Sequence, residues 1–197
     1  MKATELLLLG LVGWTAVGIL GVGVAFWRRE RERARRGVAW LARVWVVYLC
    51  VLVAVSLGQT QRVVAVGEPQ CFDEMCFTVA GVEELPGFLI RDGRRLVRVT
   101  VRVKNEGRKA QSEGLIWAYL VDAQGRRWRE SPGVSGVGLT ARVTGGDSVV
   151  SEPVFKVAGD ATGLGLVLTH GRWQPGVLVI GDSDSPLHKK TVVDLGR

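Results

Sequence analysis

The chain has 197 residues, of which 47% are hydrophobic and 23% are charged, and its net charge is +7. Most of the excess charge lies near the start: residues 1–59 contain eight Lys or Arg and three Glu, whereas residues 60–197 contain 18 basic and 16 acidic residues. The larger part therefore lacks the basic stripe that neutralises several phosphates, and we expect no nucleic-acid partner.

Two apolar runs, residues 6–27 and 38–58, begin the chain, and only Arg43 interrupts the second. A helix of about 20 residues crosses a ~30 Å hydrocarbon core, so the runs predict two transmembrane helices with membrane lipid around them. A cleaved signal peptide is the alternative for the first run. Its length of 22 residues and its ending in Trp27-Arg28-Arg29, without a small-residue cleavage site, favour a retained helix.

The link between the runs, residues 28–36, holds six Arg and two Glu. Short basic links stay on the cytoplasmic side, so we expect a multi-pass protein of the cell (inner) membrane with both chain ends outside. Trp27 and Trp40 flank the link, where indoles favour the headgroup layer, and Arg43 can extend its side chain back to that layer. We interpret these three residues as interface anchors, with a pore or relay charge as the alternative for Arg43.

The expected organisation is a membrane anchor (1–59), a linker (60–67) and an extracytoplasmic β-sandwich (68–197). Alternation in 96–104 predicts a strand with one dry face, and the apolar run 115–121 predicts a central strand with Trp117 in the core, followed by a hairpin. Further strands are expected at 75–81, 126–130, 148–157, 164–170, 177–181 and 191–195. Seven or eight short strands are typical of a sandwich.

Four segments resemble a known family: Leu96-Val-Arg-Val-Thr-Val-Arg-Val-Lys-Asn-Glu-Gly, Tyr119-Leu-Val-Asp-Ala-Gln-Gly-Arg-Arg-Trp, Thr144-Gly-Gly-Asp-Ser and Pro153-Val-Phe-Lys-Val. They are similar to immunoglobulin-like extracytoplasmic domains of unknown function in bacterial lipoproteins and membrane-anchored secreted proteins. The resemblance covers residues 68–181. It implies an immunoglobulin-like sandwich outside the cytoplasm and supplies no catalytic residues. The chain departs from the family at Ala158-Gly-Asp, where proline is common, and in its two-helix anchor.

Cys71 and Cys76 bracket four residues. Outside the cytoplasm, such a pair favours a disulfide that closes a tight turn. A redox pair, or half a metal site with Asp73 and His170, is the alternative, but a C-x-x-C spacing would suit either better. We therefore predict a disulfide and no metal.

Nucleophilic catalysis would need one of the two histidines, His170 or His188. Neither lies in a motif, and we expect both to be solvated. We predict no catalytic residue, no cofactor and no small-molecule substrate, and therefore not an enzyme.

The sequence thus favours a binding or structural module that contacts a protein or envelope component without covalent chemistry. Trp128 and Arg129, which precede the irregular stretch 131–146, are the candidate interaction residues, because Trp and Arg are frequent in binding hot spots. The alternative for Trp128 is an edge strand that packs it inward. The alternative functions are an accessory or sensory subunit of a membrane complex and, with less support, an envelope hydrolase.

Overall fold

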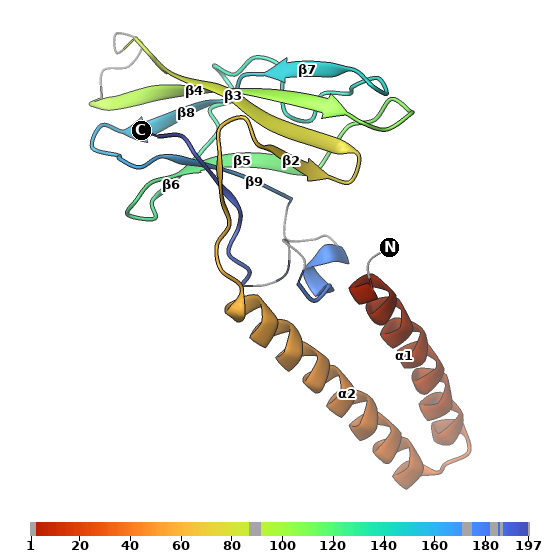
Figure 1. Ribbon diagram of the computed structural model, residues 1–197. Helices are drawn as coiled ribbons and strands as arrows, with labels where there is room; N and C mark the ends of the chain where they lie inside the picture. The colour runs from red at the N-terminus through yellow and green to blue at the C-terminus, as the bar shows by residue number, and fades with distance from the viewer. Residues whose placement is uncertain (1–2, 87–91, 171–174, 182–184, 186, 197) are drawn as a thin grey trace. The chain divides into compact units, whose positions relative to one another are not determined.

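The computed structural model describes residues 3–86, 92–170, 175–181, 185 and 187–196 (Figure 1). The chain forms two compact units, which we describe separately. The first comprises Met1–Thr60 and Arg172–Lys189, and the second comprises Gln61–Gly171 and Lys190–Arg197. A segment near the C-terminus therefore belongs to the helical unit, although the sequence placed all of 68–197 in the sandwich.

The first unit contains the helices α1 (Ala3–Trp27) and α2 (Arg31–Gly58). Their mean hydropathies over 18 residues are 2.1 and 2.3, and none of the residues in the α1 window and 11% of those in the α2 window are buried. By length and composition both helices qualify as membrane spans, and a signal sequence near the N-terminus would meet the same criteria. Trp45 of α2 donates a hydrogen bond from Nε1 to Thr15 Oγ1 of α1 over 3.0 Å, which satisfies two polar groups within the apolar runs.

The same unit contains the 3₁₀ helix η2 (Pro175–Leu178), so the prediction of a strand at 177–181 is wrong. The segment bonds to α2 instead of to a sheet. Tyr48 donates from its hydroxyl to the Leu178 carbonyl over 2.5 Å, and the hydroxyls of Ser56 and Ser185 lie 3.2 Å apart. An apolar run of this length fits a strand or a helical turn equally well, and here its bonding partner lies 130 residues away in sequence.

The second unit is a β-sandwich of two five-stranded sheets, in agreement with the predicted sandwich (Figure 1). Sheet A has the order β1 (Val63–Ala65), β10 (Val192–Asp194), β9 (Gly165–His170), β5 (Ile116–Val121) and β6 (Arg127–Arg129). Sheet B has the order β2 (Pro69–Phe72), β3 (Met75–Leu85), β4 (Arg94–Asn105) and β7 (Ser148–Ser151), and β8 (Val154–Ala158) also pairs with β4.

Two short strands had not been predicted. The expected linker 60–67 contains β1, which pairs in parallel with β10, and β2 forms a hairpin with β3. The predicted strand 148–157 is two strands, β7 and β8, separated at Glu152 and Pro153. Proline cannot donate a ladder hydrogen bond, so the break falls where the sequence contains one. Both strands still pair with β4, at its two ends.

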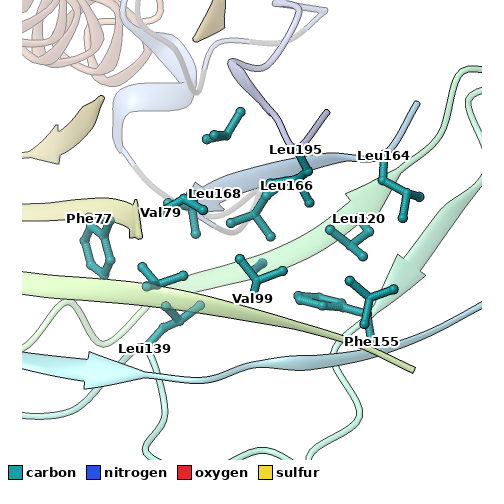
Figure 2. Close-up of a cluster of buried hydrophobic side chains, with 14 of the residues drawn as sticks. Phe77, Val79, Val99, Leu120, Leu139, Phe155, Leu164, Leu166, Leu168 and Leu195 are labelled. Carbon is teal, nitrogen blue, oxygen red and sulfur yellow. The ribbon is translucent and has the colours of Figure 1, made fainter. Parts of the chain in front are cut away.

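The core lies between the two sheets, as the labelled side chains in Figure 2 show. The predicted dry face of β4 is confirmed, because Val97, Val99, Val101 and Val103 are all buried. The irregular stretch 131–146 also contributes to the core through Leu139 and Val143. This stretch is therefore packed into the sandwich along part of its length.

Candidate functional site

The outer face of sheet A carries the most distinctive surface of the sandwich. Side chains alternate along β5: Ile116, Ala118 and Leu120 enter the core, so Trp117 and Tyr119 point to the opposite face. Trp117 is 39% exposed, and the prediction that it lies in the core is wrong. A strand that is apolar on both faces does not reveal by its sequence which face packs between the sheets.

The neighbouring strand β6 places two arginines on the same face. Arg127 lies opposite Val121, and Arg129 lies opposite Tyr119. Each guanidinium reaches diagonally over a ring: Arg127 Cζ is 5.3 Å from the Tyr119 centroid, and Arg129 Cζ is 5.9 Å from the Trp117 centroid. Within the described part of the chain, neither arginine forms an ion pair. Their positive charges are therefore held by rings rather than neutralised by carboxylates.

We call Trp117, Tyr119, Arg127 and Arg129 the arginine–aromatic face. The two rings are 5.4 Å apart, so the four side chains form one interleaved row. Tyr119 is only 7% exposed beneath this cover. Burial raises the pKa of its phenol, and the nearby Arg127 charge only partly offsets that effect, so the hydroxyl keeps its proton.

The two candidate residues from the sequence lie on different faces of sheet A. Arg129 belongs to the arginine–aromatic face. Trp128 lies opposite Leu120, is partly buried and packs against the core, with Arg126 Cζ 5.4 Å from its ring centroid. Trp128 therefore packs inward, as the alternative interpretation of the sequence had it. Trp117 and Tyr119 were missed as site residues, because the cross-strand register that brings the arginines over them is not visible in the sequence.

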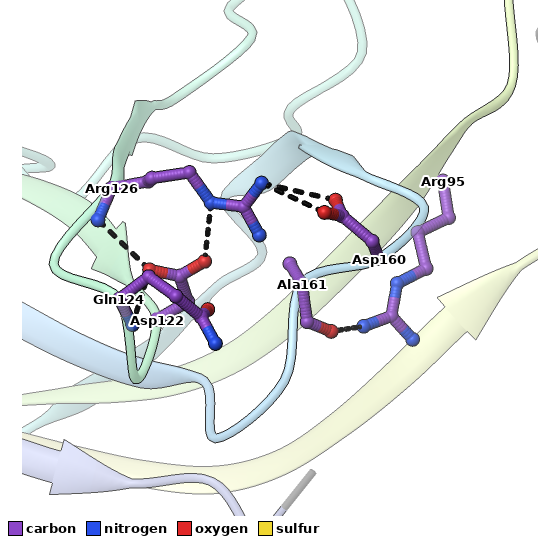
Figure 3. Close-up of polar contacts among 6 residues, drawn as sticks. All are labelled: Arg95, Asp122, Gln124, Arg126, Asp160 and Ala161. Carbon is purple, nitrogen blue, oxygen red and sulfur yellow. Dashed lines mark hydrogen bonds and ion pairs between the residues drawn. The ribbon is translucent and has the colours of Figure 1, made fainter.

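The hairpin between β5 and β6, which leads into Arg127 and Arg129, is held together by Asp122 and Arg126 (Figure 3). Asp122 Oδ1 accepts hydrogen bonds from the backbone N–H groups of Gln124 and Arg126. Its Oδ2 accepts from Arg126 Nε over 2.7 Å, and Arg126 Nη1 also contacts both carboxylate oxygens of Asp160. Gly125 has φ 78°, a conformation that favours glycine. The Asp and Gly of this motif therefore shape the turn.

Charge pairing shifts the pKa values in this cluster. Burial would raise the pKa of Asp122, but the hydrogen bonds from Arg126 outweigh it and hold that pKa below its ordinary value. The hydrogen bond from Arg126 likewise lowers the pKa of Asp160. The bonds to Asp160 and Asp122 raise the pKa of Arg126. All three groups stay charged at neutral pH, and none is poised for proton transfer.

The turn after β4 has a similar structural role. Asn105 is buried, donates from Nδ2 to the carbonyls of Lys109 and Val143, and accepts at Oδ1 from the backbone N–H of Gly107. Asn105, which lies in the first of the four family-like segments, thus holds this turn together through its hydrogen bonds. Its buried amide satisfies backbone groups that would otherwise lack partners.

A disulfide joins Cys71 and Cys76, as predicted, across directly opposed positions of β2 and β3. Among the described residues, no group of three or more His, Cys, Asp or Glu is placed to hold a metal ion. His170 is not solvated as predicted: its side chain is 9% exposed, with Nε2 3.2 Å from Glu113 Oε1 and its ring against Phe72. His188 is half-buried.

The three predicted interface anchors, Trp27, Trp40 and Arg43, all have exposed side chains on the helical unit. Exposure leaves their indole and guanidinium groups available to a headgroup layer. Their interface role stays a prediction.

No protein-family model matches the chain, and no curated protein is similar to it. Several solved structures are similar at low identity. An uncharacterised β-sandwich protein from Clostridium difficile is 12% identical over 70% of this chain and 95% of its own, with a TM-score of 0.46. The secreted protein MPT63 from Mycobacterium tuberculosis is 11% identical over 70% and 99%, with a TM-score of 0.46. The yjhA protein from Bacillus subtilis is 20% identical over 67% and 98%, with a TM-score of 0.44. At these values the similarity concerns the β-sandwich architecture alone.

Proposed function

We propose that this protein is a non-catalytic, membrane-anchored binding module that presents its β-sandwich outside the cytoplasm. The helices α1 and α2 would span the cell membrane, with the Arg-rich link 28–36 on the cytoplasmic side. Their exposed apolar surfaces support this, since such surfaces are unfavourable in water. The Cys71–Cys76 disulfide supports an oxidising compartment for the sandwich.

The proposed sandwich is of the immunoglobulin-like type. The order β10-β9-β5-β6 in sheet A follows the G-F-C-C′ order of variable-type immunoglobulin domains, and β8 pairs with β4 as strand E pairs with strand B. The β2–β3 hairpin is an addition to that plan. In this comparison the arginine–aromatic face lies on the outer surface of the G-F-C-C′ sheet.

The arginine–aromatic face is the observation that carries the proposed binding function. Tyr, Trp and Arg are the residue types most enriched in binding hot spots. A guanidinium held over a ring has lost much of its conformational freedom before a ligand arrives, so less entropy is lost on binding. Arg127 and Arg129 lack carboxylate partners among the described residues. We therefore propose an acidic partner, a carboxylate- or phosphate-bearing group of a protein or envelope component.

Site-specific cross-linking in intact cells tests this proposal. A photoreactive amino acid placed at Val121, which lies opposite Arg127 on the same face and leaves both arginines in place, should form an adduct with the partner, and Trp117→Ala in the same chain should weaken it. Arg102 supplies the control, because it is an exposed arginine on the outer face of sheet B. Equal adducts at Val121 and Arg102, or no adduct at Val121 in folded protein, would refute the arginine–aromatic face as the binding surface.

A further inference from the structure

The helices α1 and α2 approach each other closely at two glycines. A Cβ on Gly18 would lie 2.7 Å from the Leu41 side chain, and a Cβ on Gly37 would lie 2.7 Å from the Val22 side chain. Each glycine therefore receives a large side chain from the partner helix. These two contacts lie in the half of the helix pair that adjoins the Arg-rich link.

A cavity of about 510 Å³ opens between the helices at this end. Gly18, Gly21, Val22, Val24, Ala25 and Gly37 form its apolar lining, and Arg28, Glu30 and Arg33 lie at its link end. A Cβ on Gly21 would meet no other described atom within 4 Å, so this part of the wall is unfilled. The cavity thus combines an apolar wall with two guanidinium groups and one carboxylate, that of Glu30, which pairs with Arg33.

A second hollow, of about 610 Å³, adjoins the first and shares Glu30 and Arg33 with it. Its remaining lining residues are Arg29, Arg31, Glu32 and Arg36. Four arginines therefore face two glutamates. The first turn of α2 also lies here, and the positive end of its dipole adds to the attraction for an anion.

We propose that the two hollows bind one anionic phospholipid of the cytoplasmic leaflet. An acyl chain lies along the apolar wall of the first cavity, and the headgroup phosphate lies at Arg28 and Arg33, beside the second hollow. We choose an anionic phospholipid because of charge complementarity. A lipid whose acyl chain enters between the helices brings its headgroup to the excess of arginine. The inference rests on the proposed function, since it requires α1 and α2 to span the membrane with the link inside.

Native mass spectrometry of the delipidated full-length protein in detergent tests the site, with phosphatidylglycerol and phosphatidylcholine of equal acyl chains as probes. We expect phosphatidylglycerol to bind about tenfold more tightly, because both lipids carry the phosphate but only phosphatidylcholine carries a quaternary ammonium, which the excess of arginine repels. Gly21→Leu fills the unfilled wall and should abolish this preference. Gly13→Leu is the matched control, because a Cβ there also meets no described atom within 4 Å and Gly13 does not line the cavity.

A second pair of variants tests the headgroup. Arg33→Gln should weaken phosphatidylglycerol binding about tenfold. Arg35→Gln removes the same charge and should have little effect, because Arg35 lines neither hollow. The pair is well matched, since Arg33 and Arg35 each pair with a glutamate three residues earlier and are 80% and 81% exposed.

Three results would overturn the site: equal binding of both lipids, a preference that survives Gly21→Leu, or displacement of the lipid by soluble glycerol phosphate. The last would indicate a site for free phosphate. Carbonate extraction of cell membranes tests the proposed anchoring separately. Release of the protein would refute the anchoring and the lipid site together, whereas retention with no lipid preference would refute the lipid site alone.

Discussion

The β-sandwich and the helix pair place arginine in different surroundings. In the sandwich unit, Arg126 lies between two carboxylates, Asp122 and Asp160, and the 16 basic residues of 61–171 and 190–197 are nearly balanced by 14 acidic ones. In the link 28–36, six arginines share two glutamates. The ion pairs of the link are exposed, and such pairs contribute little to stability. The sandwich thus neutralises its charge internally, and the link keeps an excess for an external anion.

The arginine–aromatic face is the exception within the sandwich. Arg127 and Arg129 are held by aromatic rings, and the surrounding sheet does not cancel their charge. Arginine without sufficient carboxylate partners therefore marks both proposed sites, one on each unit.

The largest expected effect is an all-or-none difference in labelling between the units. In a Cys50→Ala background, an impermeant thiol reagent applied to intact cells should label Gln124→Cys and leave Arg35→Cys unlabelled. Both positions are exposed, whereas Ala34 in the same link is fully buried and would be a poor reporter. Labelling of Arg35→Cys alone would reverse the proposed topology.

Truncation of a core side chain should lower the free energy of unfolding of the sandwich much more than truncation of an exposed side chain. Phe155→Ala removes a fully buried ring from the sandwich and should lower the free energy of unfolding by about 3–5 kcal/mol. Thermal unfolding of the full-length protein in detergent, followed by near-ultraviolet circular dichroism, measures this. Val150→Ala, at a side chain 50% exposed on β7, should change it by less than about 0.5 kcal/mol. Equal losses would show that the assigned core is incorrect.

Loss of the disulfide should have an intermediate effect. Cys76→Ser opens a loop of about six residues and should lower stability by about 2 kcal/mol on the chain-entropy estimate. The same shift in melting temperature should follow from reductant added to the unmodified protein. Reductant should leave the melting temperature of Cys76→Ser unchanged, and a further shift there would mean that the first one had another origin.

Local pattern predicted much of the sandwich. The alternation of Val97 to Val103 identified β4 and its buried face, because period-two burial leaves a clear trace in sequence. The strands β1 and β2 were missed, since neither Val63-Val-Ala nor Pro69-Gln-Cys-Phe alternates between polar and apolar residues. Pro153 marks the break between β7 and β8 in the sequence, because proline cannot donate a ladder hydrogen bond.

Long-range pairing could not be predicted in the same way. The apolar residues of η2 fit a strand as well as a helical turn. The hydrogen bond from the Tyr48 hydroxyl to the Leu178 carbonyl, which joins the segment to α2, is not visible in the sequence. The site shows the same limit: Arg129 was selected by residue type, but its ring partner Trp117 was assigned to the core. Only the register between β5 and β6 brings the two together. Residue type therefore identified a candidate, and cross-strand geometry supplied its surroundings.

The smallest expected effect concerns the charge that the sandwich neutralises internally. A carboxylate whose pKa is lower in the folded state stabilises the fold above its unfolded-state pKa, about 3.9 for Asp, and this contribution is lost as pH falls through the folded-state value. Asp122→Asn keeps an acceptor for the backbone N–H groups but loses the charge that holds Arg126. Melting temperatures should therefore differ between this variant and the unmodified protein at pH 7 and converge below about pH 4. Asp147→Asn removes an exposed carboxylate elsewhere on the sandwich and should shift the melting temperature less at pH 7. If Asp122→Asn behaves like Asp147→Asn at both pH values, the cluster is not a source of stability, and the contrast between the internally paired arginines and those of the link would weaken.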